Sequence, residues 1–171
     1  SEAEVGSNFV TREPLAGRQA AETTEFSVVY TADTLYFGIR AFDSDPSGIV
    51  AKEMQRDADL GRNDDAIALI LDPFHDQRNA MVFATNPNGA EFDALLTDEG
   101  REFNIDWRAV WKVAAKRVPE GWSAEFAIPF RTLRYPPNAS GQPWGINIYR
   151  VIRRKNEETL WTAWSKTDNE G

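Results

Sequence analysis

The sequence has no cysteine and only one histidine, His75. Without cysteine, disulfides, thiolate catalysis and cysteine-ligated metals are excluded. A catalytic triad or a histidine-based acid–base pair would have to use His75, which lies beside Asp76 in a turn after the apolar run 66–71. The Gly-x-Ser-x-Gly elbow of many serine hydrolases is also missing. We therefore interpret His75 as a structural or exposed turn residue and expect no enzyme.

Positive charge and long apolar stretches are also scarce. The chain has 19 lysines and arginines against 27 aspartates and glutamates, a net charge of −8. This charge repels a phosphate backbone and disfavours nucleic acid as a partner. No apolar run approaches the ~20 residues of a membrane-spanning helix, so we expect no transmembrane segment. The polar start, Ser1 to Glu4, is no signal peptide and is typical of a mature fragment as well as of a cytosolic protein.

What the chain does contain is typical of one globular domain. It has 171 residues, of which 42% are hydrophobic and 27% charged. A chain of this size buries roughly 70% of its unfolded surface on folding and needs no covalent support. We expect a single domain over residues 1–171, a fragment of a longer protein.

Apolar residues recur at every second position, which predicts β-strands. The runs 26–30 and 35–42 are joined by Thr31 to Thr34, which predicts a tight hairpin. The run 66–71 is almost wholly apolar, so it should be a central strand covered on both faces. Further strands are expected over 79–85, 91–96, 107–115, 122–128, 144–153 and 159–164.

Turn-forming residues separate these runs at short intervals, and helix signals are few. About nine short strands at such spacing favour an all-β fold, an antiparallel β-sandwich of jelly-roll type. One or two short helical turns are expected, around 130–133 and 47–52.

Acidic residues gather in the loops between the predicted strands. Oxygen-rich loops at strand ends suit Ca²⁺, which takes roughly 6–8 oxygen ligands. The candidate ligands are Asp57, Asp59, Asp64 and Asp65. The spacing does not match an EF-hand, and the alternative is a solvated loop neutralised by Arg56, Arg62 or the pair Arg153 and Arg154. No carboxylate pair stands out as that of a glycosidase.

Six tryptophans offer a possible platform for sugar rings, whose C–H faces are apolar. Trp111, Trp122 and Trp144 lie inside predicted strands and should belong to the core. The tryptophans nearer strand ends are the candidates for ligand binding, with core packing as the alternative: Trp107, Trp161 and Trp164.

The basic run 150–155 contains Arg150, Arg153, Arg154 and Lys155. Apolar residues interrupt it at strand spacing, within an acidic chain. We interpret its arginines as structural partners of Glu157, Glu158 or the acidic loops.

Several of these segments together resemble carbohydrate-binding module family 9. The resemblance runs from about Val5 to Trp164 and is carried by the segments 24–30, 35–43, 65–72, 121–129 and 144–147. It implies a jelly-roll-type β-sandwich that binds sugar.

A branch of that family is more similar still, through 56–59, 72–76, 86–89 and the arginines after Tyr149. In this branch the domain is the N-terminal part of larger bacterial envelope proteins, followed by a segment that resembles an outer-membrane barrel. The resemblance implies a periplasmic or envelope location in a Gram-negative bacterium. The partner would be a glycan or, alternatively, the barrel or another domain on which this one docks.

The chain departs from the family at its sugar site. Of two tryptophans that clamp the sugar in family members, the first aligns with Arg62 and the second falls beyond Gly171. A glutamate and an arginine that bind sugar hydroxyls align with Ala68 and Ala84. The resemblance therefore places Arg62 near any ligand and implies that the family's sugar contacts are largely replaced.

Overall fold

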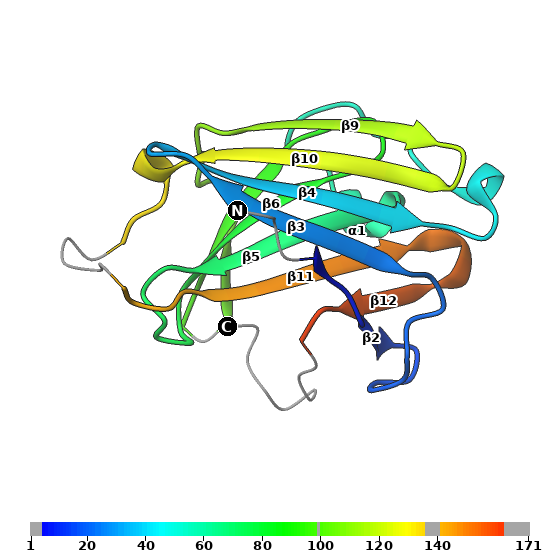
Figure 1. Ribbon diagram of the computed structural model, residues 1–171, viewed down its shortest axis with the longest axis horizontal. Coiled ribbons are helices and arrows are strands. Elements are labelled where there is room, and N and C mark those ends of the chain that lie inside the picture. The colour runs from blue at the N-terminus through cyan, green and yellow to red at the C-terminus, as the bar shows by residue number, and fades with distance from the viewer. Residues whose placement is uncertain (1–4, 99, 136–140, 163–171) are drawn as a thin grey trace.

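The computed structural model describes residues 5–98, 100–135 and 141–162. All strand pairs in this part of the chain are antiparallel, and they form two sheets that pack face to face (Figure 1). The five-stranded sheet has the order β1 (Val5–Gly6), β3 (Thr24–Tyr30), β4 (Thr34–Phe42), β10 (Gly121–Pro129) and β9 (Lys112–Val118). The expected all-β sandwich is thereby confirmed.

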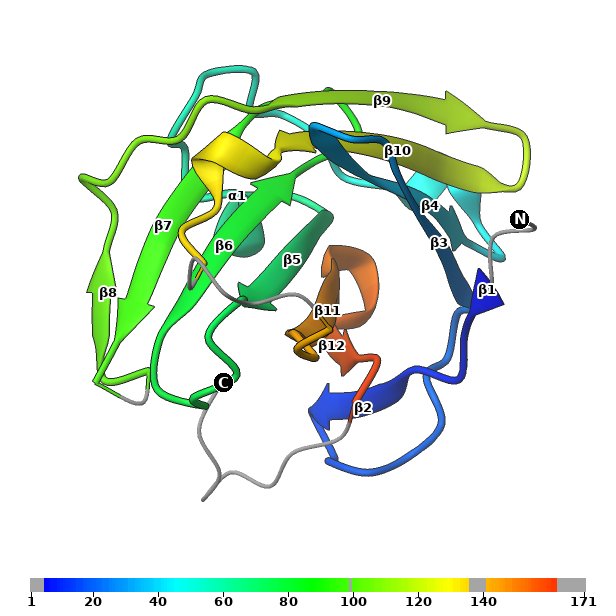
Figure 2. The same ribbon diagram turned by 60° about the vertical axis from the view of Figure 1, so that its left-hand side comes forward.

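The second sheet has seven strands and curves from β8 to β2 (Figure 2). Its order is β2 (Val10–Glu13), β12 (Glu157–Leu160), β11 (Gly145–Ile152), β5 (Ala66–Asp72), β6 (Ala80–Thr85), β7 (Phe92–Thr97) and β8 (Glu102–Asn104). β5 lies at its centre, and every residue of β5 is buried, as its unbroken apolar run predicts.

The main core fills the space between the sheets. Alternate side chains point inward because successive residues of a strand face opposite sides. Phe37 and Phe126 from the five-stranded sheet belong to the same buried cluster as Leu69, Phe83 and Ile148 from the seven-stranded one. Burial of each such side chain stabilises the fold by roughly 1.5–3 kcal/mol. Of the tryptophans assigned to the core, Trp111 and Trp122 are buried and Trp144 is half-buried.

A second apolar cluster covers the opposite, outer face of the seven-stranded sheet. Ala68 and Ile70 from β5 lie there with Val82 and Ala84 from β6 and Ala94 from β7. This explains why β5 has no polar residue between Ala66 and Leu71: one face supports the core and the other forms the floor of the groove described below.

Several boundaries differ from the prediction. The hairpin at Thr31–Thr34 is confirmed, with the Thr31 N–H donating to the Thr34 carbonyl at 2.9 Å. The strand expected over 107–115 begins only at Lys112, because the connection before it is held by other bonds. There the Ala109 N–H donates to Asp93 at 3.3 Å, and the Val110 carbonyl accepts from Thr132 at 2.6 Å.

The expected strand 159–164 is β12, which starts earlier and ends at Leu160. The two expected helical turns are the short 3₁₀ turns η1 (Pro46–Gly48) and η2 (Phe130–Thr132). A further 3₁₀ turn, η3 (Arg153–Lys155), and the single-turn helix α1 (Leu60–Asn63) were not predicted, because each is too short to show a helical repeat. Within the described residues, no helix has the length and apolarity needed to cross a bilayer.

Candidate ligand-binding groove

A groove of about 280 Å³ lies on the outer face of the seven-stranded sheet. Its floor comes from β5 and β6, and its sides come from β2 and β11 on one flank and from β7 and β8 on the other. Asp59 and the helix α1 close one end. The lining residues are Arg12, Asp59, Leu60, Gly61, Ala66, Ala68, Ile70, Val82, Ala84, Phe92, Phe103 and Tyr149.

The hollow follows from the register of four strands. Ala68 is paired with Tyr149 on one side and with Ala84 on the other, and Ala84 is paired with Phe92. The row across the sheet is therefore aromatic, small, small, aromatic. Two methyl groups between two large rings leave a depression, since neighbouring side chains on one face stand about 4.5–5.5 Å apart.

The aromatic flank is doubled by the edge strand. Phe103 of β8 stacks on Phe92, with ring centroids 6.1 Å apart and an interplanar angle of 16°. Phe103 is 49% exposed although it is a large apolar residue. The pair thus presents a ring surface to solvent at the mouth of the groove, which is how proteins commonly contact flat apolar ligand faces.

Polar groups are confined to the rim. Arg12 forms an ion pair with Glu158 at 3.1 Å. Burial, together with the Glu158 carboxylate that accepts its hydrogen bond, raises the pKa of Tyr149 well above its ordinary value, so the phenol stays neutral. Among the described lining residues, only Arg12, Asp59 and Tyr149 carry polar side chains. The arrangement suits an apolar ligand face with polar groups at its edge.

Arg62 lies in α1, next to the groove but not in its lining. Its side chain is 83% exposed and pairs with Asp59 at 3.6 Å. Ala68 and Ala84, the two positions that the resemblance marked as altered sugar contacts, are cross-strand partners on the floor. The resemblance thus pointed to two positions that lie on the groove floor, while sequence reasoning did not single out Phe92, Phe103 or Arg12.

The two candidate tryptophans within the described residues are not in the groove lining. Trp107 packs edge-to-face on Phe83 at 5.9 Å, and Trp161 packs the same way on Phe26 at 4.8 Å, both against the main core. Both are half-buried, so their role as a ligand platform stays a prediction. Trp164 lies outside the described residues.

The four candidate metal ligands have different surroundings. Asp64 is fully buried and accepts from the backbone N–H groups of Lys52 and Glu53, each at 2.9 Å, and from Asn86 Nδ2 at 2.7 Å. Asp65, also fully buried, accepts from the Arg153 N–H at 3.0 Å and more weakly from Val50. These two carboxylates tie loops to strands.

Asp57 and Asp59 lie nearer the surface. Asp57 pairs with Arg108 at 2.9 Å and with Arg56 at 3.7 Å, and Asp59 pairs with Arg62. No three acidic or histidine side chains in the described ranges are grouped as metal ligands. Calcium binding stays a prediction, and most of these carboxylates already have cationic or N–H partners.

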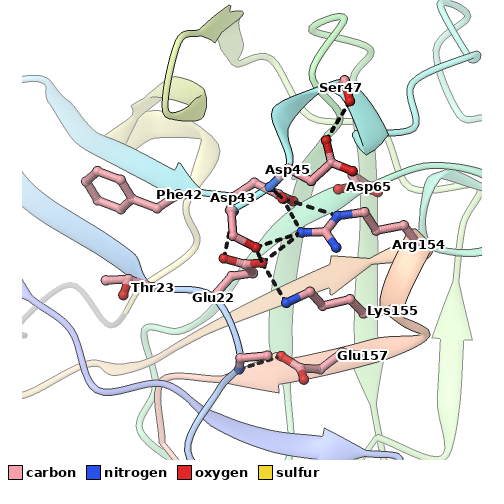
Figure 3. A network of polar contacts seen from close by, with 12 residues as sticks. Glu22, Thr23, Phe42, Asp43, Asp45, Ser47, Asp65, Arg154, Lys155 and Glu157 are labelled. Atoms are coloured by element: carbon pink, nitrogen blue, oxygen red, sulfur yellow. Dashed lines mark hydrogen bonds and ion pairs between the residues drawn. The ribbon is translucent and has the colours of Figure 1, made fainter.

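A charge network with buried carboxylates and partly exposed cations lies where the β4 and β11 strands end (Figure 3). Arg154 contacts Asp43 and also Glu22, at 2.8 Å, while Lys155 reaches Glu22 at 2.6 Å. Burial opposes ionisation of Glu22, but the bonds from Lys155 and Ser44 outweigh it and lower its pKa from 4.5 to about 2. Arg154 therefore pairs with the acidic loop at Asp43, one of the partners expected of the basic run. The other expected partners bond elsewhere, Glu157 to the Ala21 N–H and Glu158 to Arg12.

Arg150 lies beneath this network and is fully buried. Its guanidinium crosses from β11 to the other sheet, donating to the Thr23 carbonyl at 3.0 Å, the Thr24 hydroxyl at 3.0 Å and the Phe42 carbonyl at 2.7 Å. Burial lowers its pKa to about 10, against the raising effect of Asp43 and Asp65. Arg150 therefore stays charged at neutral pH and joins the two sheets.

His75 is exposed in the turn after β5, with φ of 51°. Its backbone N–H donates to the Asp72 carbonyl at 3.3 Å. Asp76 instead accepts from Arg78 and Asn79. The reading of His75 as a turn residue is confirmed.

Comparison with known proteins gave similarity in structure only. No family model matches the chain, and no curated protein matches it. A candidate carbohydrate-binding protein from Bacteroides uniformis superposes with a TM-score of 0.70 and 12% identity, over 96% of this chain and 79% of that one. A family 9 carbohydrate-binding module from Caldicellulosiruptor kristjanssonii, solved with cellotriose, superposes with a TM-score of 0.57 and 14% identity, over 93% and 71%. The chain therefore has the fold of a domain like the family 9 carbohydrate-binding modules.

Proposed function

We propose that this domain is a non-catalytic module that binds a carbohydrate in the groove of the seven-stranded sheet. The observation that carries the proposal is the groove itself, a hollow with aromatic flanks and a polar rim, on a fold shared with carbohydrate-binding proteins. Both fold neighbours are named for binding carbohydrate rather than for catalysis, which supports a module without chemistry of its own.

The groove has the chemistry that sugar rings need. One face of a pyranose ring is made of C–H groups and packs on an aromatic ring, as on the exposed part of Phe103. The ring's hydroxyls then lie at the edge, where Arg12 and Asp59 provide N–H donors and carboxylate acceptors. Binding of this kind requires no metal and no titrating group.

The test is affinity-gel electrophoresis and calorimetry with soluble polysaccharides and oligosaccharides. Phe103→Ala removes the exposed ring and should weaken binding at least tenfold, an energy of about 1.4 kcal/mol. The control is Phe74→Ala, which removes a phenylalanine of similar exposure, 46%, from the β5–β6 turn outside the groove lining. Equal affinity of the two variants, or no retained carbohydrate at all, would count against the proposal.

A second candidate function is docking on another part of the same protein. Three large apolar side chains in and after β8 are exposed, Phe103 at 49%, Ile105 at 56% and Val110 at 69%, and exposed apolar surface is typical of contact sites. Titration with the rest of the full-length protein, instead of a sugar, separates the two functions. A location in the Gram-negative cell envelope is part of this proposal and is tested by cell fractionation.

A further inference from the structure

We infer that the groove selects sugars poor in free hydroxyls, above all acetylated sugars, over hydroxyl-rich glucans. The inference rests on the proposed function and specifies its ligand. It follows from the chemistry of the floor, which differs from that of the rim.

The floor offers no hydrogen-bonding side chain. Ala68, Ile70, Val82 and Ala84 present only methyl and methylene groups, and each is less than 10% exposed. The backbone beneath them is also engaged, because β5 is paired on both sides, with β11 and with β6. A hydroxyl pressed onto this floor would lose its water and gain no partner.

That loss is large on the scale of sugar binding. An unsatisfied buried polar group costs roughly a 5- to 150-fold loss of affinity. Each methyl-sized group buried in its place instead raises the affinity about fourfold. The floor therefore discriminates between a hydroxyl and an apolar substituent at the same ring position.

The size of the groove and the polar groups at its rim indicate which sugar substituent fits the floor. The volume of about 280 Å³ lies just below the ~300–1,000 Å³ typical of ligand sites, so one ring with its substituents fills it. An acetyl group combines a methyl for the floor with a carbonyl that accepts from N–H donors. Arg12 supplies such donors at the rim.

The test uses matched sugars that differ at one position. Calorimetry compares N,N′,N″-triacetylchitotriose with cellotriose, and the methyl glycosides of N-acetylgalactosamine and of galactose. We expect the acetylated member of a pair to bind at least tenfold more tightly. Equal or tighter binding of the plain sugars would overturn the inference and leave the proposed function standing. Binding of neither member, in these pairs and in the polysaccharide assays, would overturn both.

A variant of the floor tests the cause of the preference. Ala84→Ser places one hydroxyl on the floor and should reduce the ratio of the two trisaccharide affinities severalfold. Ala114→Ser, on the exposed face of β9, makes the same change outside the groove lining and should leave the ratio as it is. An unchanged ratio in Ala84→Ser, with the variant folded by circular dichroism, would show that the floor does not choose the ligand.

Discussion

The groove and the charge network differ in how their polar groups are used. On the groove floor there is no charged or hydrogen-bonding side chain among the described residues, and the surface is open to a ligand. In the network and beneath it, Glu22, Asp43 and Arg150 are buried. Arg154 donates to Glu22, and Arg150 donates to the Thr23 carbonyl just before the other sheet's strand β3. Charged residues in this protein mainly hold strands and loops together, while an apolar surface is the part left for binding.

The largest expected effect comes from Arg150→Met, beneath the charge network. Loss of the guanidinium removes three hydrogen bonds between the sheets and leaves Asp43 and Asp65 without a neighbouring buried cation. The substitution should therefore reduce the free energy of unfolding by about 3–5 kcal/mol. Urea unfolding measures this. Arg40→Met is the control, because that arginine is 60% exposed on the outer face and its pairs should contribute less than about 1 kcal/mol. Similar decreases in the free energy of unfolding in both variants would show that buried and exposed arginines contribute equally to stability.

Asp64→Asn should have the next largest effect. All three of the Asp64 partners named above are N–H donors, and the amide would turn its own NH₂ group toward one of them. We expect a loss of about 1–3 kcal/mol in the free energy of unfolding. Asp59→Asn, at a side chain that is 62% exposed, should change it little. A stable Asp64→Asn variant would show that these loops do not depend on the carboxylate.

The lowered pKa of Glu22 predicts that the protein loses stability in acid. The folded pKa of Glu22, about 2, lies below the ordinary value of 4.5. The stabilisation is therefore complete above pH 4.5 and is lost as the pH falls toward 2. The difference between the two pKa values corresponds to about 3 kcal/mol, which solvent screening at the partly exposed Lys155 reduces to about 2 kcal/mol. Unfolding measured from pH 6 to pH 2 should show a shallower decline in Glu22→Gln than in the unmodified protein. Glu125→Gln, on the exposed face of β10, serves as the control and should follow the unmodified protein.

The smallest expected effect concerns calcium. Asp57 and Asp59 are the candidate ligands with side chains nearer the surface, and two carboxylates with arginine partners should form a weak site. We expect millimolar Ca²⁺ to raise the melting temperature of chelator-treated protein by only about 1–2 °C. Asp59→Asn should abolish that rise. A rise that survives the substitution would place the ion elsewhere.

The alternation of apolar and polar residues along each strand was sufficient to predict the sandwich, because the apolar face of a strand must be buried whichever strands it pairs with. The short edge strands β1, β2 and β8 escaped prediction, since two to four residues carry too little alternation. The sequence left calcium and arginine open as partners of the acidic loops, because it does not show which cations and backbone N–H groups fold against each carboxylate.

The sequence by itself determined the all-β class, the hairpin at Thr31–Thr34 and the doubly covered strand β5, because each depends on local spacing and polarity. Only the tertiary structure decided that Tyr149, Ala68, Ala84 and Phe92 form one row across four strands. Register between strands distant in the chain is set by packing of the whole sheet. A groove made by two alanines between two rings therefore exists only once the strands have paired.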